Sequence, residues 1–93
     1  MMENFQRFEA KAKLLKALSH PVRLCIARGL LENGACNVTK IHCGLNMPQS
    51  TISQHLLKLK EAGIIHGERK GVEIFYSISS DAMRELIRAL KLE

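Results

Sequence analysis

The sequence lacks the features of a membrane or secreted protein. None of its apolar runs approaches the roughly 18 residues needed to span a bilayer, although 46% of its residues are hydrophobic. The segment from Met1 to Asn4 has neither the basic region nor the long apolar run of a signal peptide. We therefore expect a cytoplasmic protein without a membrane partner.

Cysteines are few, and their number is odd. A reducing compartment keeps thiols free, so Cys25, Cys36 and Cys43 are not expected to form a disulfide framework. On a continuous helix the Cα atoms of Cys36 and Cys43 would be ~10 Å apart, beyond the roughly 7 Å limit for a disulfide, which leaves Cys25 as the better partner for either. We expect Cys25 to be buried on an apolar helix face, and Cys36, in a loop after Gly34, to be more exposed. All three are candidate redox thiols, with simple packing as the alternative.

Features of an enzyme are also missing. The chain shows no acid–base pair, no nucleophile with a suitable base and no glycine-rich phosphate loop, so we expect neither an enzyme nor a cofactor. Acidic residues are outnumbered, since nine Asp and Glu face fourteen Lys and Arg, for a formal charge of +5. The basic excess lies in residues 1–47. A positive net charge favours polyanionic partners.

The chain has no internal repeat, low-complexity tract or long linker. A domain of its length buries only about 60 to 65% of the surface that its unfolded chain exposes, so a partner subunit would add stability. We therefore expect residues 1–93 to form a single domain that acts as a homodimer.

Apolar spacing predicts two helices in the first third of the chain. Apolar residues recur at three- and four-residue steps from Phe5 to Leu18, which describes one face of an amphipathic helix. Ser19 is the expected cap of a second helix, and Pro21 is tolerated in its first turn. Asn33-Gly34 is a typical helix end.

Two further helices are predicted around a tight turn. Residues 38–43 form a short helix with Asn37 as its cap, and Gly44 and Asn46 supply the turn that follows. Pro48 then opens a helix that runs to about Ala62. A core-facing stripe on this helix consists of Ile52, Leu56 and Leu59.

The pattern then changes from helical to strand periodicity. Residues 64–69 and 72–78 are rich in β-branched and aromatic residues and flank Lys70-Gly71, which predicts a β-hairpin. Ser79 or Ser80 caps a last helix with apolar residues on one side. The fold class is mostly α with a small β-hairpin wing, in the order α-α-α-α-β-β-α, which is a winged helix-turn-helix.

Removing the buried stripe from the 48–62 helix leaves a polar face suited to DNA. Amides and hydroxyls can bond base edges in the major groove, which admits a helix, and the helix N-terminus favours a phosphate. The candidate contacts on this helix are Gln49, Ser50, Ser53, Gln54, His55, Lys58 and Lys60. Arg69 and Lys70 at the hairpin tip are expected to reach phosphates or the minor groove, and so to add affinity more than sequence choice.

Four segments in this order resemble the ArsR/SmtB family of bacterial winged-helix repressors. They are ALSHPVRL at 17–24, PQSTISQHL at 48–56, LKEAGII at 59–65 and GVEIFYSI at 71–78. The resemblance implies that Gln49, Ser50, Ser53 and Gln54 face the major groove of a double-stranded DNA operator. It also implies that the first and last helices form a dimer interface, and a two-fold dimer would bind an inverted repeat with half-sites about 10 base pairs apart.

The metal-sensing patterns of this family are missing from the chain. Asn37 and Thr39 stand where many members have a Cys-Val-Cys pair, and the last helix offers Asp81, Glu85 and Glu93 but no His. In this the chain is similar to family members that lack metal sites. We expect no metal, and keep as an alternative a metal-responsive repressor with an irregular site built from Cys36, His42 and Cys43.

A second alternative is a winged-helix protein–protein adaptor that does not bind DNA, because a fold does not dictate a function. An adaptor surface should be more apolar or aromatic than the polar face of the 48–62 helix. The sequence identifies neither the operator nor an effector molecule.

Overall fold

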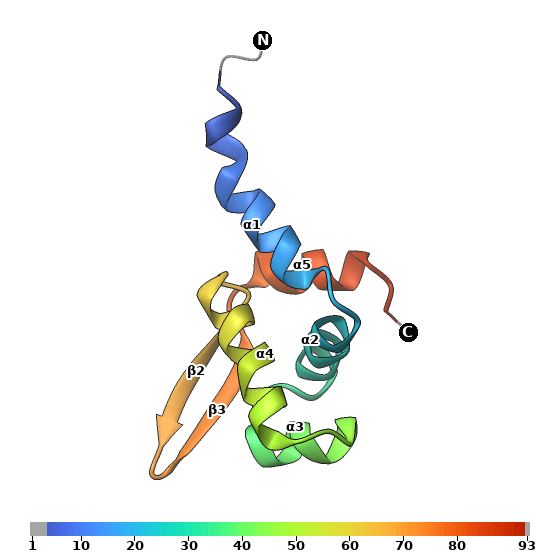
Figure 1. The fold of residues 1–93 in the computed structure, drawn as a ribbon, viewed down its shortest axis with the longest axis vertical. Helices are drawn as coiled ribbons and strands as arrows, with labels where there is room; N and C mark the ends of the chain where they lie inside the picture. Colours follow the sequence, from blue (N-terminus) through green and yellow to red (C-terminus); the bar gives the residue numbers. More distant parts are fainter. Residues whose placement is uncertain (1–3, 93) are drawn as a thin grey trace.

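The computed structural model describes residues 4–92, apart from the side chain of Cys43. A 3-10 turn, η1 (Phe5–Phe8), leads into α1 (Glu9–Leu18), and α2 (Pro21–Asn33) follows after a short break. The N-terminal end of α1 extends away from the rest of the molecule (Figure 1). The C-terminal end of α1 packs against α2 and α4 (Gln49–Glu61). The helix predicted from Phe5 to Leu18 is therefore present, with a 3-10 first turn.

The cap of α2 differs from the prediction. The Nδ1 atom of His20 accepts a hydrogen bond from the backbone N–H of Val22 at 3.1 Å, so His20 caps the helix. Ser19 instead ends α1, and its own N–H donates to the carbonyl oxygen of Lys16. The prediction of Ser19 as the cap was wrong by one residue because an imidazole nitrogen does here what a hydroxyl usually does.

Helices α3 (Val38–Leu45) and α4 form the helix-turn-helix. The Asn37 side chain caps α3 as predicted, with Oδ1 accepting from the N–H of Lys40 at 2.9 Å. Asn46 adopts the left-handed conformation, with φ 49°, and this residue type tolerates that turn geometry. Pro48 precedes the first residue of α4, so the chain enters the second helix directly from the turn.

The predicted hairpin is present and has an additional strand. Strands β2 (Ile65–Lys70) and β3 (Glu73–Ile78) pair antiparallel, with Lys70 opposite Glu73 at the turn. The two-residue strand β1 (Cys36–Asn37) pairs with the other edge of β3, giving the strand order β1-β3-β2. The sheet therefore joins the hairpin to the residues that begin α3.

One position in the hairpin requires glycine for space. A Cβ atom on Gly67 would lie 2.9 Å from Cγ2 of Ile74 and 3.2 Å from Cε1 of Tyr76. The Tyr76 ring therefore covers the Gly67 backbone on one face of the hairpin, a close approach that a side chain at position 67 would block.

A single apolar cluster holds these elements together. Its fully buried members include Ile52, Leu56 and Leu59 of α4, as predicted, and Ile64 and Ile65 at the start of the hairpin. Helix α5 (Asp81–Ala89) adds Ile87 to the cluster and is capped by Ser80, whose Oγ accepts from the N–H of Met83. No helix within residues 4–92 is long and apolar enough to cross a membrane.

The observed fold is mostly helical with a β-hairpin, and the predicted fold class is confirmed. Figure 1 shows the hairpin projecting beside α4, with α3 at the same end of the molecule. The hairpin therefore lies next to α4 and at the same end of the molecule as α3.

Candidate nucleic-acid interface

Helix α4 separates its buried and exposed faces cleanly. Gln49, Ser50, Ser53 and Gln54 are all exposed, while Ile52 on the opposite face is completely buried. Lys58 and Lys60 are exposed further along the helix. The structure thus leaves all of these predicted polar contacts accessible to solvent, and their contact with DNA remains a prediction.

The N-terminal end of α4 offers backbone donors beside these side chains. Its cap residue is Pro48, which provides no side-chain hydrogen bond to the first turn. Backbone N–H groups at a helix start carry a partial positive charge and favour a phosphate. The polar face of α4 therefore begins at a position suited to a DNA backbone.

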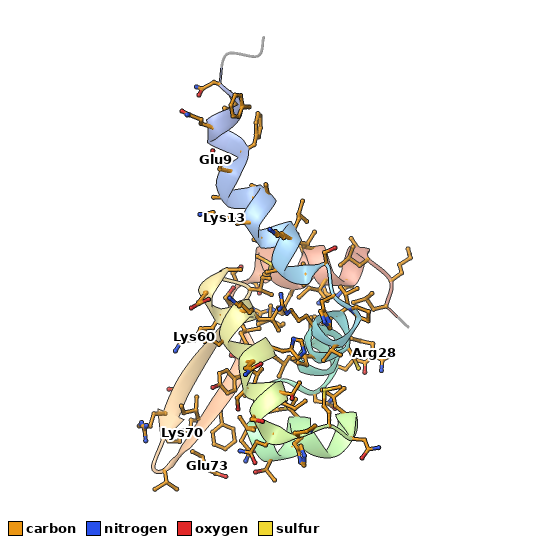
Figure 2. The ribbon with its side chains drawn as sticks, viewed as in Figure 1. Glu9, Lys13, Arg28, Lys60, Lys70 and Glu73 are labelled. Atoms are coloured by element: carbon orange, nitrogen blue, oxygen red, sulfur yellow. The ribbon has the colours of Figure 1, made fainter. Side chains whose placement is uncertain are left out.

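The hairpin carries exposed cations near its turn. Arg69 and Lys70 end β2, where Nη1 of Arg69 donates to the carbonyl oxygen of Gly71 at 3.3 Å. The Nζ atom of Lys70 lies 5.6 Å from the centroid of the Phe75 ring. Figure 2 shows Lys70 near the hairpin tip and Lys60 on the same side of the molecule. The hairpin can therefore place positive charge beside a duplex that contacts α4.

Asn37 connects the hairpin to α3. Its Nδ2 donates to Oε2 of Glu73 at 2.9 Å, while its Oδ1 caps α3. A small groove of about 260 Å³ beside this contact is lined by Thr39, Gln49 and residues of β3. Asn37 is thus a structural residue that joins the start of α3 to β3.

His55 lies at a helix packing contact and not on the outward face of α4. It is half-buried, and its Nδ1 accepts a hydrogen bond from Nε of Arg23 at 3.1 Å. Its ring lies 4.6 Å, centroid to centroid, from that of His20. His55 therefore joins α4 to α2, and its contact with DNA stays a prediction.

This packing makes protonation of His55 unfavourable. Burial, together with the neighbouring His20 and Arg23, lowers the pKa of His55 below its ordinary value. A proton on Nδ1 would also remove the acceptor that Arg23 uses. The native state therefore binds a proton at this site less readily than the unfolded state does.

We predict that acid weakens the fold through His55. Above a pH of about 6.5 both states are neutral at this residue, and as the pH falls below that value the unfolded state gains its proton first, so native stability decreases. The substitution His55→Gln retains an acceptor but does not titrate. Urea unfolding at pH 7.5 and 5.5 should show a smaller loss of stability in the variant, and an identical loss in both proteins would contradict the assignment.

The two described cysteines exchange their predicted environments. Cys25 is exposed, while Cys36 is only 5% exposed and its Sγ lies 3.4 Å from the carbonyl oxygen of Gly34. Cys36 is buried because β1 places it against β3, opposite Tyr76. The side chain of Cys43 lies outside the described part of the structure. Cys25 and Cys36 are free thiols and line a common cavity of about 230 Å³ between α2 and α3.

Of the carboxylates considered for a metal, Glu93 lies outside the described residues. Asp81 forms an ion pair with Arg84 in the first turn of α5. Within the described residues, no group of three His, Cys, Asp or Glu side chains is placed to hold a metal ion. The irregular site with Cys43 includes a side chain that the structure does not describe.

Two features of the surface were missed by the sequence reasoning. Leu57 is 51% exposed and follows Ser50, Ser53 and Gln54 on the outward face of α4 at three- and four-residue steps. This spacing alone indicates that Leu57 shares the outward face of α4. Lys13 and Lys16 of α1 lie beside Lys58 in a groove, and only their tertiary placement reveals this.

Known proteins similar to this chain are regulators of transcription. The family model for the arsR family of bacterial regulatory proteins matches residues 20–66. The transcriptional repressor PagR of Bacillus anthracis is 41% identical over 86 residues, covering 92% of this chain and 86% of PagR. The crystal structure of PagR matches with a TM-score of 0.83 at 40% identity, covering 94% of this chain and 99% of that one.

Two further solved structures share the fold at lower identity. Reduced HlyU from Vibrio cholerae matches with a TM-score of 0.85 at 30% identity, covering 97% of this chain and 94% of HlyU. A homodimeric winged helix-turn-helix DNA-binding domain, Mb0332 from Mycobacterium bovis, matches with a TM-score of 0.87 at 26% identity, covering 99% of this chain and 85% of the domain.

Proposed function

This chain belongs to the arsR family of bacterial regulatory proteins, and on that premise we propose that it is a homodimeric transcriptional repressor of the cytoplasm that binds an inverted-repeat operator. The observation that carries the proposal is the exposed polar face of α4 beside the cations of the hairpin. The polar face reads base edges, and the hairpin contacts the backbone.

Base selection rests on the first two turns of α4. The amide groups of Gln49 and Gln54 can each donate and accept, which suits adenine or a neighbouring pair of bases, and the hydroxyls of Ser50 and Ser53 suit either base edges or phosphates. Leu57 adds an apolar contact for a thymine methyl group at the far end of this face.

Apolar surface on the first helical segment supports the dimer. Phe5, Phe8 and Leu15 are 69%, 57% and 55% exposed, and Leu90 after α5 is 44% exposed. Burial of a fully exposed side chain of this size contributes about 1.5 to 3 kcal/mol, and covering the part of each that is still exposed contributes a share of that. These side chains therefore favour a second copy of the chain as partner. A two-fold pair would present its α4 helices to successive major grooves about 10 base pairs apart.

An adaptor that does not bind DNA is less well supported. Among the described residues of α4, Leu57 is the only large hydrophobic side chain that is mainly exposed. Protein–protein interfaces have cores enriched in aromatic and apolar groups. The outward face of α4 is instead polar and is flanked by lysines.

Binding to a fluorescent fragment of the promoter of its own gene tests the proposal. We expect tight, sequence-selective binding by a dimer of the 10.5 kDa chain, with affinity that falls steeply as salt rises because phosphate contacts release counterions. The variant with Arg69→Gln and Lys70→Gln should bind specific and random DNA more weakly by a similar factor, with a salt dependence less steep by about one per cation that contacts a phosphate. Binding without selectivity, or none, would contradict a repressor of this operator.

The same titration with oxidised protein addresses the candidate thiols. Cys25 is the exposed one of the two described cysteines, so we infer that it reacts first. Loss of binding after mild oxidation that Cys25→Ser prevents would make the protein thiol-responsive. Unchanged binding by the oxidised protein would remove the thiols from regulation.

A further inference from the structure

A basic groove lies along the flank of α4 opposite the hairpin. It has a volume of about 560 Å³ and is formed by helices α1, α2 and α4. Its lining residues are Lys13, Lys16, Ala17, Arg23, Lys58, Glu61 and Ala62. Four of these seven residues are cations and one is an acid, so the groove is strongly positive.

Helical geometry places this groove and the hairpin on opposite flanks of α4. Gln49 lines the small groove that includes residues of β3, whereas Lys58 lines the basic groove. Nine residues separate them, and at about 100° per residue this corresponds to two and a half turns, so their side chains point in opposite directions. The outward polar face, with Ser50 and Gln54, lies between the two flanks.

The cations of the groove are available to a ligand. Lys13, Lys16 and Lys58 are exposed, and none of them forms an ion pair with another residue of the range 4–92. Figure 2 shows Lys13 on α1, above the C-terminal end of α4. Two of the lining residues, Ala17 and Ala62, have small side chains, so a ligand can approach the protein backbone closely there.

Arg23 is held in place at the inner wall of the groove. Its Nε donates to Nδ1 of His55, and its Nη1 donates to the carbonyl oxygen of Ala17 at 3.2 Å. Its Nη2 has no hydrogen-bond partner within the described residues. The guanidinium is therefore a fixed positive charge, which loses little side-chain entropy when it meets an anion.

We propose that this groove receives the sugar–phosphate backbone of the operator, on the strand across the major groove from the one that meets the hairpin. The major groove is about 12 Å wide and an α-helix with its side chains is about as broad, so a helix seated in it has a phosphate backbone on each flank. The hairpin cations serve one flank, and Lys13, Lys16 and Lys58 serve the other. The inference rests on the proposed operator binding and extends its footprint to α1.

A dimer contact at Leu15 leaves the Lys13 side of the groove open. Lys13 and Leu15 are two residues apart on α1, so their side chains diverge by about 200° around the helix. A partner that covers Leu15 therefore does not cover Lys13. The proposal also gives the basic excess in residues 1–47 a role in DNA binding, since Lys13, Lys16 and Arg23 all come from that part of the chain.

The double variant Lys13→Gln, Lys16→Gln tests the proposal against a control of equal charge. The control is Lys40→Gln, Lys91→Gln, because these exposed lysines line cavities that contain no residue of α4 or the hairpin. We expect the groove variant to bind operator and random DNA more weakly by a similar factor. The slope of log affinity against log salt should be less steep by about one for each lysine removed. The control should retain the wild-type slope.

Operators with single uncharged phosphate linkages can locate the proposed contact on the duplex. In operators carrying single methylphosphonate linkages, wild-type protein should lose affinity at the linkages on the flank away from the hairpin contacts, and the groove variant should lose little more there. This non-additivity marks a direct pairing between lysine and phosphate.

The outcomes separate this inference from the proposed function. If wild-type protein binds its operator selectively but the groove variant has the slope of the control, the groove does not contact DNA and the repressor assignment stands. If the salt slope changes but no single methylphosphonate linkage shows coupling to the lysines, the lysines act only through long-range electrostatic attraction. The proposal that the groove contacts the DNA backbone is then wrong. If wild-type protein itself shows no selective binding, the operator proposal fails.

Discussion

Replacing Ser53 and Gln54 together by alanine is expected to remove most of the selectivity for the operator. Both side chains are exposed on the outward face of α4, between the hairpin and the basic groove. A good base contact contributes about 1 to 3 kcal/mol of discrimination. A loss of about 2 to 4 kcal/mol corresponds to roughly 30- to 1000-fold weaker operator binding, while affinity for random DNA should change little.

A matched pair of substitutions controls for the change of residue type. Gln6→Ala and Ser19→Ala remove the same side chains at exposed positions outside α4 and the hairpin. Fluorescence anisotropy with operator and random duplexes at one fixed salt concentration gives both affinities. Operator affinity of the α4 variant equal to that of the control would exclude Ser53 and Gln54 from base reading.

Truncating the buried side of the same helix should have its largest effect on folding. Leu59 is completely buried in the apolar cluster, so Leu59→Ala removes apolar contacts and leaves a cavity. Changes of this kind cost about 2 to 5 kcal/mol. A typical domain has only 5 to 15 kcal/mol of stability, so we expect a large fall in the urea midpoint, measured at constant protein concentration because the dimer contributes.

Leu57→Ala is the internal control for this experiment. It makes the same chemical change on the same helix, but at a side chain that is 51% exposed. Helix propensity changes equally in both variants, so the difference between them reports burial. Equal destabilisation by the two substitutions would show that Leu59 is not in a well-packed core.

Several elements could be predicted from the sequence because their signals are local. The stripe of Ile52, Leu56 and Leu59 has helical period and is fully buried. Asn37 precedes a short apolar helix and caps it. The glycine between two β-branched segments marks a hairpin turn, and Gly71 adopts a positive φ there. In each case a few neighbouring residues determine the structure.

Other features depend on contacts between distant residues. Strand β1 has two residues, too few for a period, and exists because β3 has a free edge beside it. The exposure of Cys25 and Cys36 was predicted in reverse because α2 has apolar residues on several faces, and its buried face was set by Ile26, Ala27 and Leu30. The cap at His20 is a residue type that capping preferences do not favour.

The candidate site also combines features that follow from local sequence with features that depend on distant contacts. Exposure of the polar α4 residues follows from the position of the buried stripe, which the sequence contains. The partner of His55 is Arg23, 32 residues earlier, and no local pattern indicates that the two side chains meet. The assembly of Lys13, Lys16 and Lys58 likewise requires α1 to cross the end of α4, which only the packing of the helices determines.

The pairing of β1 with β3 also affects the spacing between α4 and the hairpin. The chain leaves β1 directly into α3, and Asn37 bonds both the start of α3 and Glu73 of β3, so these contacts tie the hairpin to the helix-turn-helix. In the proposed complex, these contacts restrain the distance between the polar face of α4 and the hairpin cations. A half-site whose bases and flanking backbone differ from this spacing has to bend its own duplex to be bound, and the stiffness of DNA then becomes part of how targets are selected.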